Sequence, residues 1–172
     1  VDNMKVELSN SEPPIGDGSA YPYVEVILEA GIVEQDAPKH YLSIDTPLAY
    51  SEKDRGVDLV VVPSDKLRIT FMVDYKNPAL GTQYTTLYDL DDEFVEEYSK
   101  ARTFCFLTEV EELFNSGLIK GGSIDNAIVI MDQELTPEMI AKLKGQFDMT
   151  REVFAGKTGI LNDIPLRYYN EP

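Results

Sequence analysis

The sequence predicts an α+β fold. Strand-like alternation of apolar and polar residues gathers between residues 41 and 88, while the helical stripes lie in separate stretches and seldom alternate strictly with strands. The stretches "VDNMKVEL" at residue 1 and "IDNAIVIM" at residue 124 also share an aliphatic-Asp-Asn opening into a strand pattern, as two copies of one strand–helix unit would.

The first forty residues predict a strand, a loop and a helix. Residues 4–8 alternate with period two, and the Pro- and Gly-containing stretch "NSEPPIGDGS" follows as a loop. Asp17 or Ser19 is placed to cap a helix whose stripe begins at Tyr21 and ends before Gly31. The polar stretch after it predicts a boundary near residues 36–41.

The middle of the chain predicts strands over residues 41–49, 57–62 and 67–75. The turn residues "PSDK" lie between the second and third of these and predict a hairpin joining them. A short strand in "YTTLY" and a helix in "DDEFVEEYSKA", capped near Asp91, come next.

The last third begins with the clearest helix signal of the chain. Thr108 and Glu111 fit a Thr-x-x-Glu capping box, and Gly117 stands where a left-handed residue ends a helix. "IDNAIVIM" predicts a strand buried on both faces. Thr136 and Pro137 open a further helix, and the tail predicts loop and short strand.

Composition excludes several classes of function. Fifteen Lys and Arg against 31 Asp and Glu give a net charge of −16, so the clustered cations of a nucleic-acid site are absent. The sequence contains no apolar run near the ~18 residues of a membrane-spanning helix. A single cysteine fits a reducing compartment, and we expect a cytoplasmic protein. The apolar pattern already running at Met4 suggests a chain cut from something longer.

Few residues offer chemistry by themselves. One histidine, His40, and one cysteine, Cys105, do not supply the three protein ligands of a catalytic zinc site. We expect His40 in a solvated linker and Cys105 buried as a small apolar side chain. "KGGS" at 120–123 favours a tight turn over a phosphate-binding loop. The Thr103 hydroxyl can donate to an oxyanion or satisfy a local backbone group, and its neighbours leave both roles open.

Five blocks in order resemble one enzyme family: "VDNMKVEL…PPIGDGSA", "DYKNPALGTQ", "ARTFCF", "NSGLIKGGSIDNAIVI" and "GILNDIPLRYYNEP". They are similar to the zinc-dependent UDP-3-O-acyl-N-acetylglucosamine deacetylase of lipid A biosynthesis, in the form fused to a hydroxyacyl-carrier-protein dehydratase. The resemblance implies two similar domains, each a two-layer sheet-and-helix sandwich. Residues 1–38 would be the last strand and helix of the first domain, and residues 39–172 most of the second.

The family resemblance also implies a reaction. Zinc activates water, a glutamate acts as base, and the N-acetyl group of the UDP-linked acylated glucosamine is hydrolysed. The zinc ligands of the family match no residue of this chain, so we expect Zn²⁺ in the intact enzyme and none bound to this part, which would be inactive alone.

The resemblance assigns site residues one by one. Thr103 would hold the carbonyl oxygen as it becomes an oxyanion, with Phe104 beside it in the substrate site, and Tyr75 would lie near the uridine. An insert over residues 107–131 would form a hydrophobic passage for the acyl chain. Its lining positions would be Val110, Ile119, Gly122, Ser123, Ile124, Ala127 and Val129.

Two rival hypotheses remain. One is a non-catalytic acidic α+β binding module, and the other is a hydrolase that uses Cys105. Unpaired strand edges further predict dimers or domain exchange in a partial chain.

Overall fold

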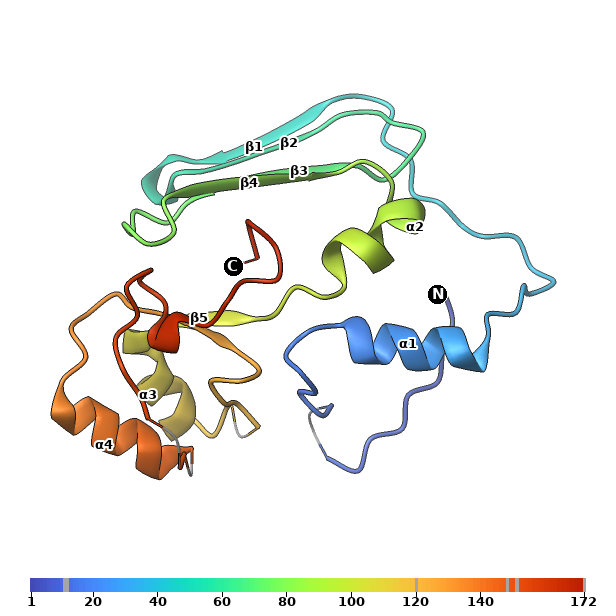
Figure 1. The fold of residues 1–172 in the computed structure, drawn as a ribbon. Coiled ribbons are helices and arrows are strands. Elements are labelled where there is room, and N and C mark those ends of the chain that lie inside the picture. Colours follow the sequence, from blue (N-terminus) through green and yellow to red (C-terminus); the bar gives the residue numbers. More distant parts are fainter. Residues whose placement is uncertain (11–12, 120, 148, 151, 172) are drawn as a thin grey trace.

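The computed structural model describes residues 1–10, 13–119, 121–147, 149–150 and 152–171. Its helices and strands confirm the α+β class, with the strands in three separate two-stranded sheets (Figure 1). In chain order the elements are α1 (Tyr21–Ala30), β1 (Leu48–Glu52), β2 (Val57–Val61), β3 (Ile69–Asp74), β4 (Thr82–Leu87), α2 (Leu90–Glu93), β5 (Phe104–Phe106), α3 (Leu107–Asn115), β6 (Ile128–Ile130) and α4 (Pro137–Gln146).

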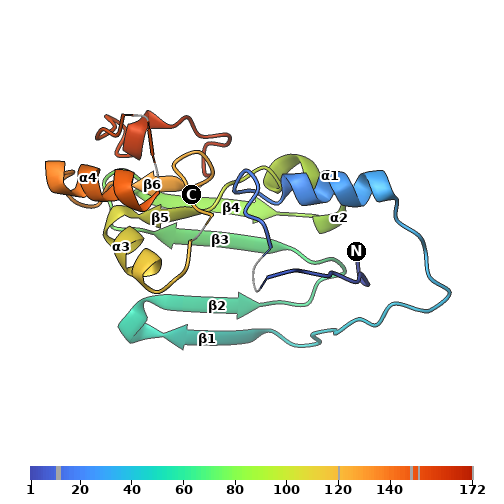
Figure 2. The same cartoon turned by 90° about the horizontal axis from the view of Figure 1, so that it is seen from below.

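Two antiparallel hairpins form one side of the molecule and run alongside each other (Figures 1 and 2). In the first, Leu48 pairs with Val61, and in the second, Ile69 pairs with Leu87. The predicted hairpin between residues 57–62 and 67–75 is therefore wrong. A short 3₁₀ turn, Lys53–Arg55, followed by Gly56 at φ 65° folds β2 back on β1, which leaves "PSDK" as a link between the hairpins.

The expected strand over residues 4–8 is also wrong, because these residues are irregular. Met4, Val6 and Leu8 are 59%, 62% and 47% exposed. Alternation alone does not make a strand, since backbone N–H and C=O groups need a neighbouring strand to pair with. Residues 41–47 likewise remain irregular, and β1 begins only at Leu48.

Helix α1 spans the predicted stretch, with Gly31 at φ 86° just after it, but its N-cap is Ala20 and the predicted cap by Asp17 or Ser19 is wrong. The Ser19 hydroxyl accepts from the Tyr21 amide at 3.3 Å, and Asp17 in turn accepts from the Ser19 hydroxyl at 2.7 Å. Helix α2 is shorter than predicted: Asp89 caps it by accepting from the amide of Asp91, and a single π-helical turn, Phe94–Tyr98, continues it.

Strand β5, α3 and β6 form a strand–helix–strand unit with parallel strands, in which Phe104 pairs with Ile128. The predicted Thr108–Glu111 capping box is wrong: the N-cap of α3 is Phe106, whose side chain cannot accept a hydrogen bond, and only the glutamate half of such a box is present, two residues earlier. The Glu109 carboxylate accepts from the Phe106 amide at 2.9 Å, while Thr108 donates its hydroxyl proton to Asp132 at 2.5 Å. The predicted buried strand is confirmed as β6, since all three of its residues are buried.

The core lies on both faces of this strand pair. One face carries Ile128 and Ile130 together with Leu80 and Ile160. The other face packs against α3 and α4 through seven buried side chains: Leu107, Val110, Ile124, Val129, Leu143, Val153 and Leu161. Helix α4 begins as predicted, with the Thr136 hydroxyl accepting from the Met139 amide at 3.3 Å. This second cluster surrounds the pocket described next.

Candidate functional site

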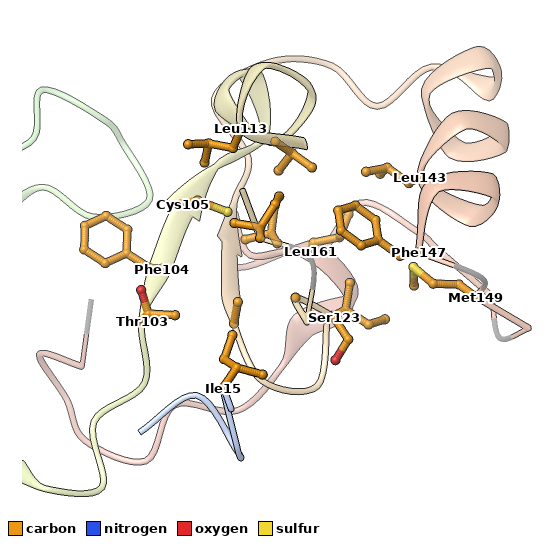
Figure 3. Close-up of a pocket in the computed structure, with 16 residues that line it drawn as sticks. Ile15, Thr103, Phe104, Cys105, Leu113, Ser123, Leu143, Phe147, Met149 and Leu161 are labelled. Carbon is orange, nitrogen blue, oxygen red and sulfur yellow. The ribbon is translucent and has the colours of Figure 1, made fainter. Parts of the chain in front are cut away.

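A pocket of about 170 Å³ opens beside β5, between α3, α4 and the turn before β6 (Figure 3). An apolar cavity of roughly 150 Å³ is large enough for a molecule the size of benzene. Thr103 and Phe104 lie at one side of the pocket, and Phe147 and Met149 lie at the other (Figure 3). Its walls are almost entirely aliphatic and aromatic, so it suits a hydrocarbon segment.

Nine of the ten predicted site residues line this one pocket. They are Thr103, Phe104, Val110, Ile119, Gly122, Ser123, Ile124, Ala127 and Val129. The tenth, Tyr75, lies outside the lining and contacts it through Phe104, with the two rings edge-to-face and their centroids 5.6 Å apart. The structure thus brings together residues that are up to 26 positions apart in the chain (103 to 129).

Thr103 is an exposed residue whose backbone is fully engaged. Its amide donates to the Gly18 carbonyl at 3.0 Å, and its carbonyl accepts from the Ile128 amide at 2.9 Å. Within the described part of the chain, its hydroxyl makes no hydrogen bond. Of the two roles that the sequence left open, a local backbone partner is therefore not observed, and the hydroxyl remains able to bind a ligand.

Phe104 differs in orientation from its neighbours because side chains alternate along a strand. Its ring points to the opposite side of β5 from the Cys105 thiol (Figure 3). There it packs edge-to-face with Phe106, at a centroid distance of 6.1 Å, as well as with Tyr75. The rings of Tyr75, Phe104 and Phe106 form an aromatic cluster that packs on the side of β5 opposite the Cys105 thiol.

The turn before β6 gives the pocket its small-residue wall. The Gly122 amide donates to the Ile119 carbonyl at 2.9 Å, which confirms a tight turn here, although Ile119 carries the positive φ of 48°. Lys120 lies outside the described residues. Buried Asn126 ties the turn together: its side-chain oxygen accepts from the Ser123 amide at 2.7 Å, and its amide group donates to the Gly121 carbonyl at 2.9 Å.

The chain's one cysteine and one histidine do not point to catalysis. Burial, with smaller contributions from Glu109 and Asp132, raises the pKa of the Cys105 thiol to about 11, so it is protonated at neutral pH. Cys105 is only partly buried, packed against the core cluster that contains Leu107 and Val110, so its expected burial is confirmed in part. His40 is exposed in irregular chain, as expected for a linker residue.

Sequence reasoning did not assign several lining residues to the pocket. Leu113, Leu143 and Phe147 belong to helical stripes that patterning detects, but patterning does not say which cavity they face. Ile15 comes from the Pro- and Gly-containing loop near the N-terminus and carried no signal. Cys105, Met149 and Leu161 complete the lining.

Comparison with known proteins identifies the family. A family profile described as UDP-3-O-acyl N-acetylglycosamine deacetylase matches residues 1–146. The chain belongs to this deacetylase family. It is 50% identical over its whole length to a bifunctional LpxC/FabZ enzyme of Chlorobaculum tepidum and 37% identical to one of Porphyromonas gingivalis. A Bdellovibrio bacteriovorus protein named UDP-3-O-acyl-N-acetylglucosamine deacetylase is 44% identical over 76% of the chain.

The chain spans only 37% of the length of the two bifunctional relatives and 42% of the Bdellovibrio protein. The residues present do not fit a zinc ion: across the described ranges, no three His, Cys, Asp or Glu side chains form a group that could hold a metal. Within the described residues, no helix combines the length and apolar character needed to cross a bilayer.

Proposed function

We propose that this chain is the substrate-side part of an enzyme that deacetylates a UDP-linked, O-acylated N-acetylglucosamine in lipid A biosynthesis. The observation that carries the proposal is the convergence of nine residues, assigned by resemblance alone, on one apolar pocket. Family membership and the similarity to deacetylases support it. The zinc that the resemblance implies would be held by residues that match no part of this chain.

The pocket would bind the acyl chain. Its aliphatic walls on α3 and β6 exclude water from a hydrocarbon, and the small residues of the turn before β6 leave space for a chain to pass. The aromatic cluster behind β5 keeps Phe104 and its neighbour Thr103 in place while the acyl group occupies the pocket. Acyl binding would thereby set the position of the sugar relative to Thr103.

Thr103 would act on the amide that is hydrolysed. Its hydroxyl, with no partner among the described residues, would donate a hydrogen bond to the carbonyl oxygen as negative charge develops there. A donor of this kind commonly contributes about 10²- to 10³-fold to a hydrolysis rate. Tyr75 would lie toward the uridine, and residues 1–38 would belong to a preceding domain of similar two-layer architecture.

Two measurements test the proposal. The chain itself is titrated with a graded series of 3-hydroxy fatty acids, and we expect binding that strengthens with chain length and weakens when Val129 is replaced by Asp. The full-length gene product is assayed for acetate release from the UDP-linked substrate, and Thr103→Val should lower kcat by about 10²-fold. Absence of acyl binding together with absence of acetate release would favour the acidic binding module instead.

A further inference from the structure

A buried ion pair joins the residue before Thr103 to the end of the described chain. The side chains of Arg102 and Glu171 are 6% and 0% exposed. Their contact is two-pronged: Arg102 Nε donates to Glu171 Oε1 at 2.8 Å, and Arg102 Nη2 donates to Oε2 at 3.0 Å. This geometry holds a guanidinium and a carboxylate in one fixed orientation.

The same carboxylate also accepts two backbone amides. The amide of Arg102 donates to Oε1 at 2.9 Å, and the amide of Arg167 donates to Oε2 at 2.6 Å. Burial alone would raise the pKa of Glu171, but these hydrogen bonds and the charge of Arg102 outweigh it and hold the pKa below its ordinary value. Glu171 therefore stays ionised at neutral pH, with both oxygens satisfied.

The pair acts directly on the backbone that carries Thr103. Glu171 fixes the amide of Arg102, Gly18 fixes the amide of Thr103, and Ile128 fixes the carbonyl of Thr103. Three neighbouring backbone groups are thus held from three different segments of the chain. The hydroxyl of Thr103 makes no hydrogen bond within the described residues, so it is the one polar group of this residue that is left for a ligand.

We propose that Glu171 is a positioning residue, whose carboxylate locks the backbone at Arg102 and so aims the Thr103 hydroxyl. The inference rests on the proposed role of Thr103 in deacetylation. A donor to an oxyanion works only within a narrow range of distance, and a misplacement of about 1 Å can cost roughly 10²-fold in rate. Nothing in this role requires Glu171 to touch the substrate.

The first test measures backbone order and does not depend on catalysis. In Glu171→Gln, one acceptor oxygen becomes an NH₂ group that opposes the N–H donors of Arg102 and Arg167. Hydrogen exchange at the amides of Thr103 and Ile128 should become about tenfold faster, while the β3–β4 amides stay unchanged. The matched control is Glu52→Gln, which breaks an exposed contact with Arg55 and should alter neither region.

A second variant protects the test against misfolding. Arg102→Lys keeps the positive charge but contacts the carboxylate through one nitrogen in place of two. Hydrogen exchange at the amides of Thr103 and Ile128 should therefore become faster than in the wild type, but by less than in Glu171→Gln. Native exchange at Thr103 and Ile128 in both folded variants would overturn the proposal.

The second test is a double-mutant cycle in the full-length gene product. Glu171→Gln should lower kcat by roughly 10- to 100-fold with little change in KM, and it should cause no further loss when Thr103 is already Val. Equal losses in both backgrounds would overturn the proposal. If Thr103→Val alone leaves kcat unchanged, the proposed function of Thr103 fails, and the exchange experiment still decides whether Glu171 orders this backbone.

Discussion

Gly18 lies so close to Asn126 that a Cβ on residue 18 would sit 1.6 Å from the Asn126 carbonyl oxygen. Gly18 also adopts φ +85°, a conformation that L side chains rarely adopt. Only glycine fits here, and the contact joins the loop that carries Ile15 to the turn before β6. The Gly18 carbonyl also accepts from the Thr103 amide. Gly18 therefore contacts both the turn before β6 and the residue that precedes β5.

We predict that Gly18→Ala lowers the free energy of unfolding by at least about 2 kcal/mol, because backbone strain and a steric clash add together. Gly31→Ala is the matched control: Gly31 has φ +86°, but a Cβ added there would meet no atom within 4 Å, so only backbone strain applies and a smaller loss, on the order of 1–2 kcal/mol, is expected. Thermal or urea unfolding of both variants provides the comparison. Equal losses would show that the contact with Asn126 is unimportant.

A pH dependence follows from Glu171. Its folded pKa lies below the ordinary 4.5, so its stabilisation is complete above the unfolded pKa and is lost as the pH falls through the folded value. At neutral pH, Glu171→Gln should cost about 3 kcal/mol, since one partner of a buried pair is removed. Urea unfolding of the wild type and of Glu171→Gln measures the difference between their free energies of unfolding. This difference should stay constant down to about pH 5 and become smaller below pH 4.5. A gap that widens in acid would contradict the assignment.

Phe147 closes the side of the pocket away from Thr103. Phe114, which does not line the pocket, packs edge-to-face behind it with centroids 5.5 Å apart. We predict that Phe147→Ala shifts the preferred acyl length upward and lowers the free energy of unfolding by about 2 kcal/mol, less than for a fully buried phenylalanine. The measurement is calorimetric titration with the graded 3-hydroxy fatty acids. Phe154→Ala, an exposed position outside the pocket, should keep the wild-type preference.

Cys105 provides a label inside the pocket. With a pKa of about 11, roughly one thiol in ten thousand is ionised at neutral pH, so alkylation by iodoacetamide should be far slower than for a free cysteine. The rate should rise about tenfold per pH unit and fall when a fatty acid fills the pocket. Alkylation at the rate of glutathione would contradict the buried environment and revive the Cys105 hydrolase hypothesis.

We also predict self-association of the chain. Among the described residues, no further strand pairs with either hairpin, and large apolar side chains such as Tyr50, Leu59 and Phe71 are more than half exposed on them. Pairing of hairpin edges between two copies would bury part of this surface. Sedimentation over a wide concentration range measures this, and a single monomeric species at the highest concentration would refute it.

Local signals explain what the sequence predicts well. Thr136 and Pro137 start α4, because a helix cap needs only residues adjacent in the sequence. The continuous apolar run ending at Ile130 becomes a buried strand, because a run without polar residues is typical of a strand covered on both faces. Strand pairing was not predictable in this way. The link "PSDK" carries turn residues, yet β2 pairs with β1 through the turn at Lys53–Arg55, and only the tertiary structure decides which neighbouring strands pair.

The same limit applies to the site. Resemblance identified the residues of the pocket that lie in recognisable motifs, and patterning identified the helices around it. Glu171 and Ile15 lie within two of the blocks that carry the resemblance, but neither was assigned a role, because a lone glutamate in an acidic chain and a lone isoleucine in a loop carry no local pattern. Their partners, Arg102 and Gly121, are about seventy and one hundred positions away in the chain.

The bond between Arg102 and Glu171 joins residues 69 positions apart, and this separation has a consequence for folding. Contacts of such high sequence separation form late, since the entropy of closing a long loop is lost before the contact contributes. During synthesis, β5, α3 and β6 leave the ribosome well before Glu171 does. The part of the pocket wall on β5, α3 and β6 is therefore available before Leu161 and Glu171 are, and we expect Thr103 to acquire its final orientation only when this C-terminal segment docks.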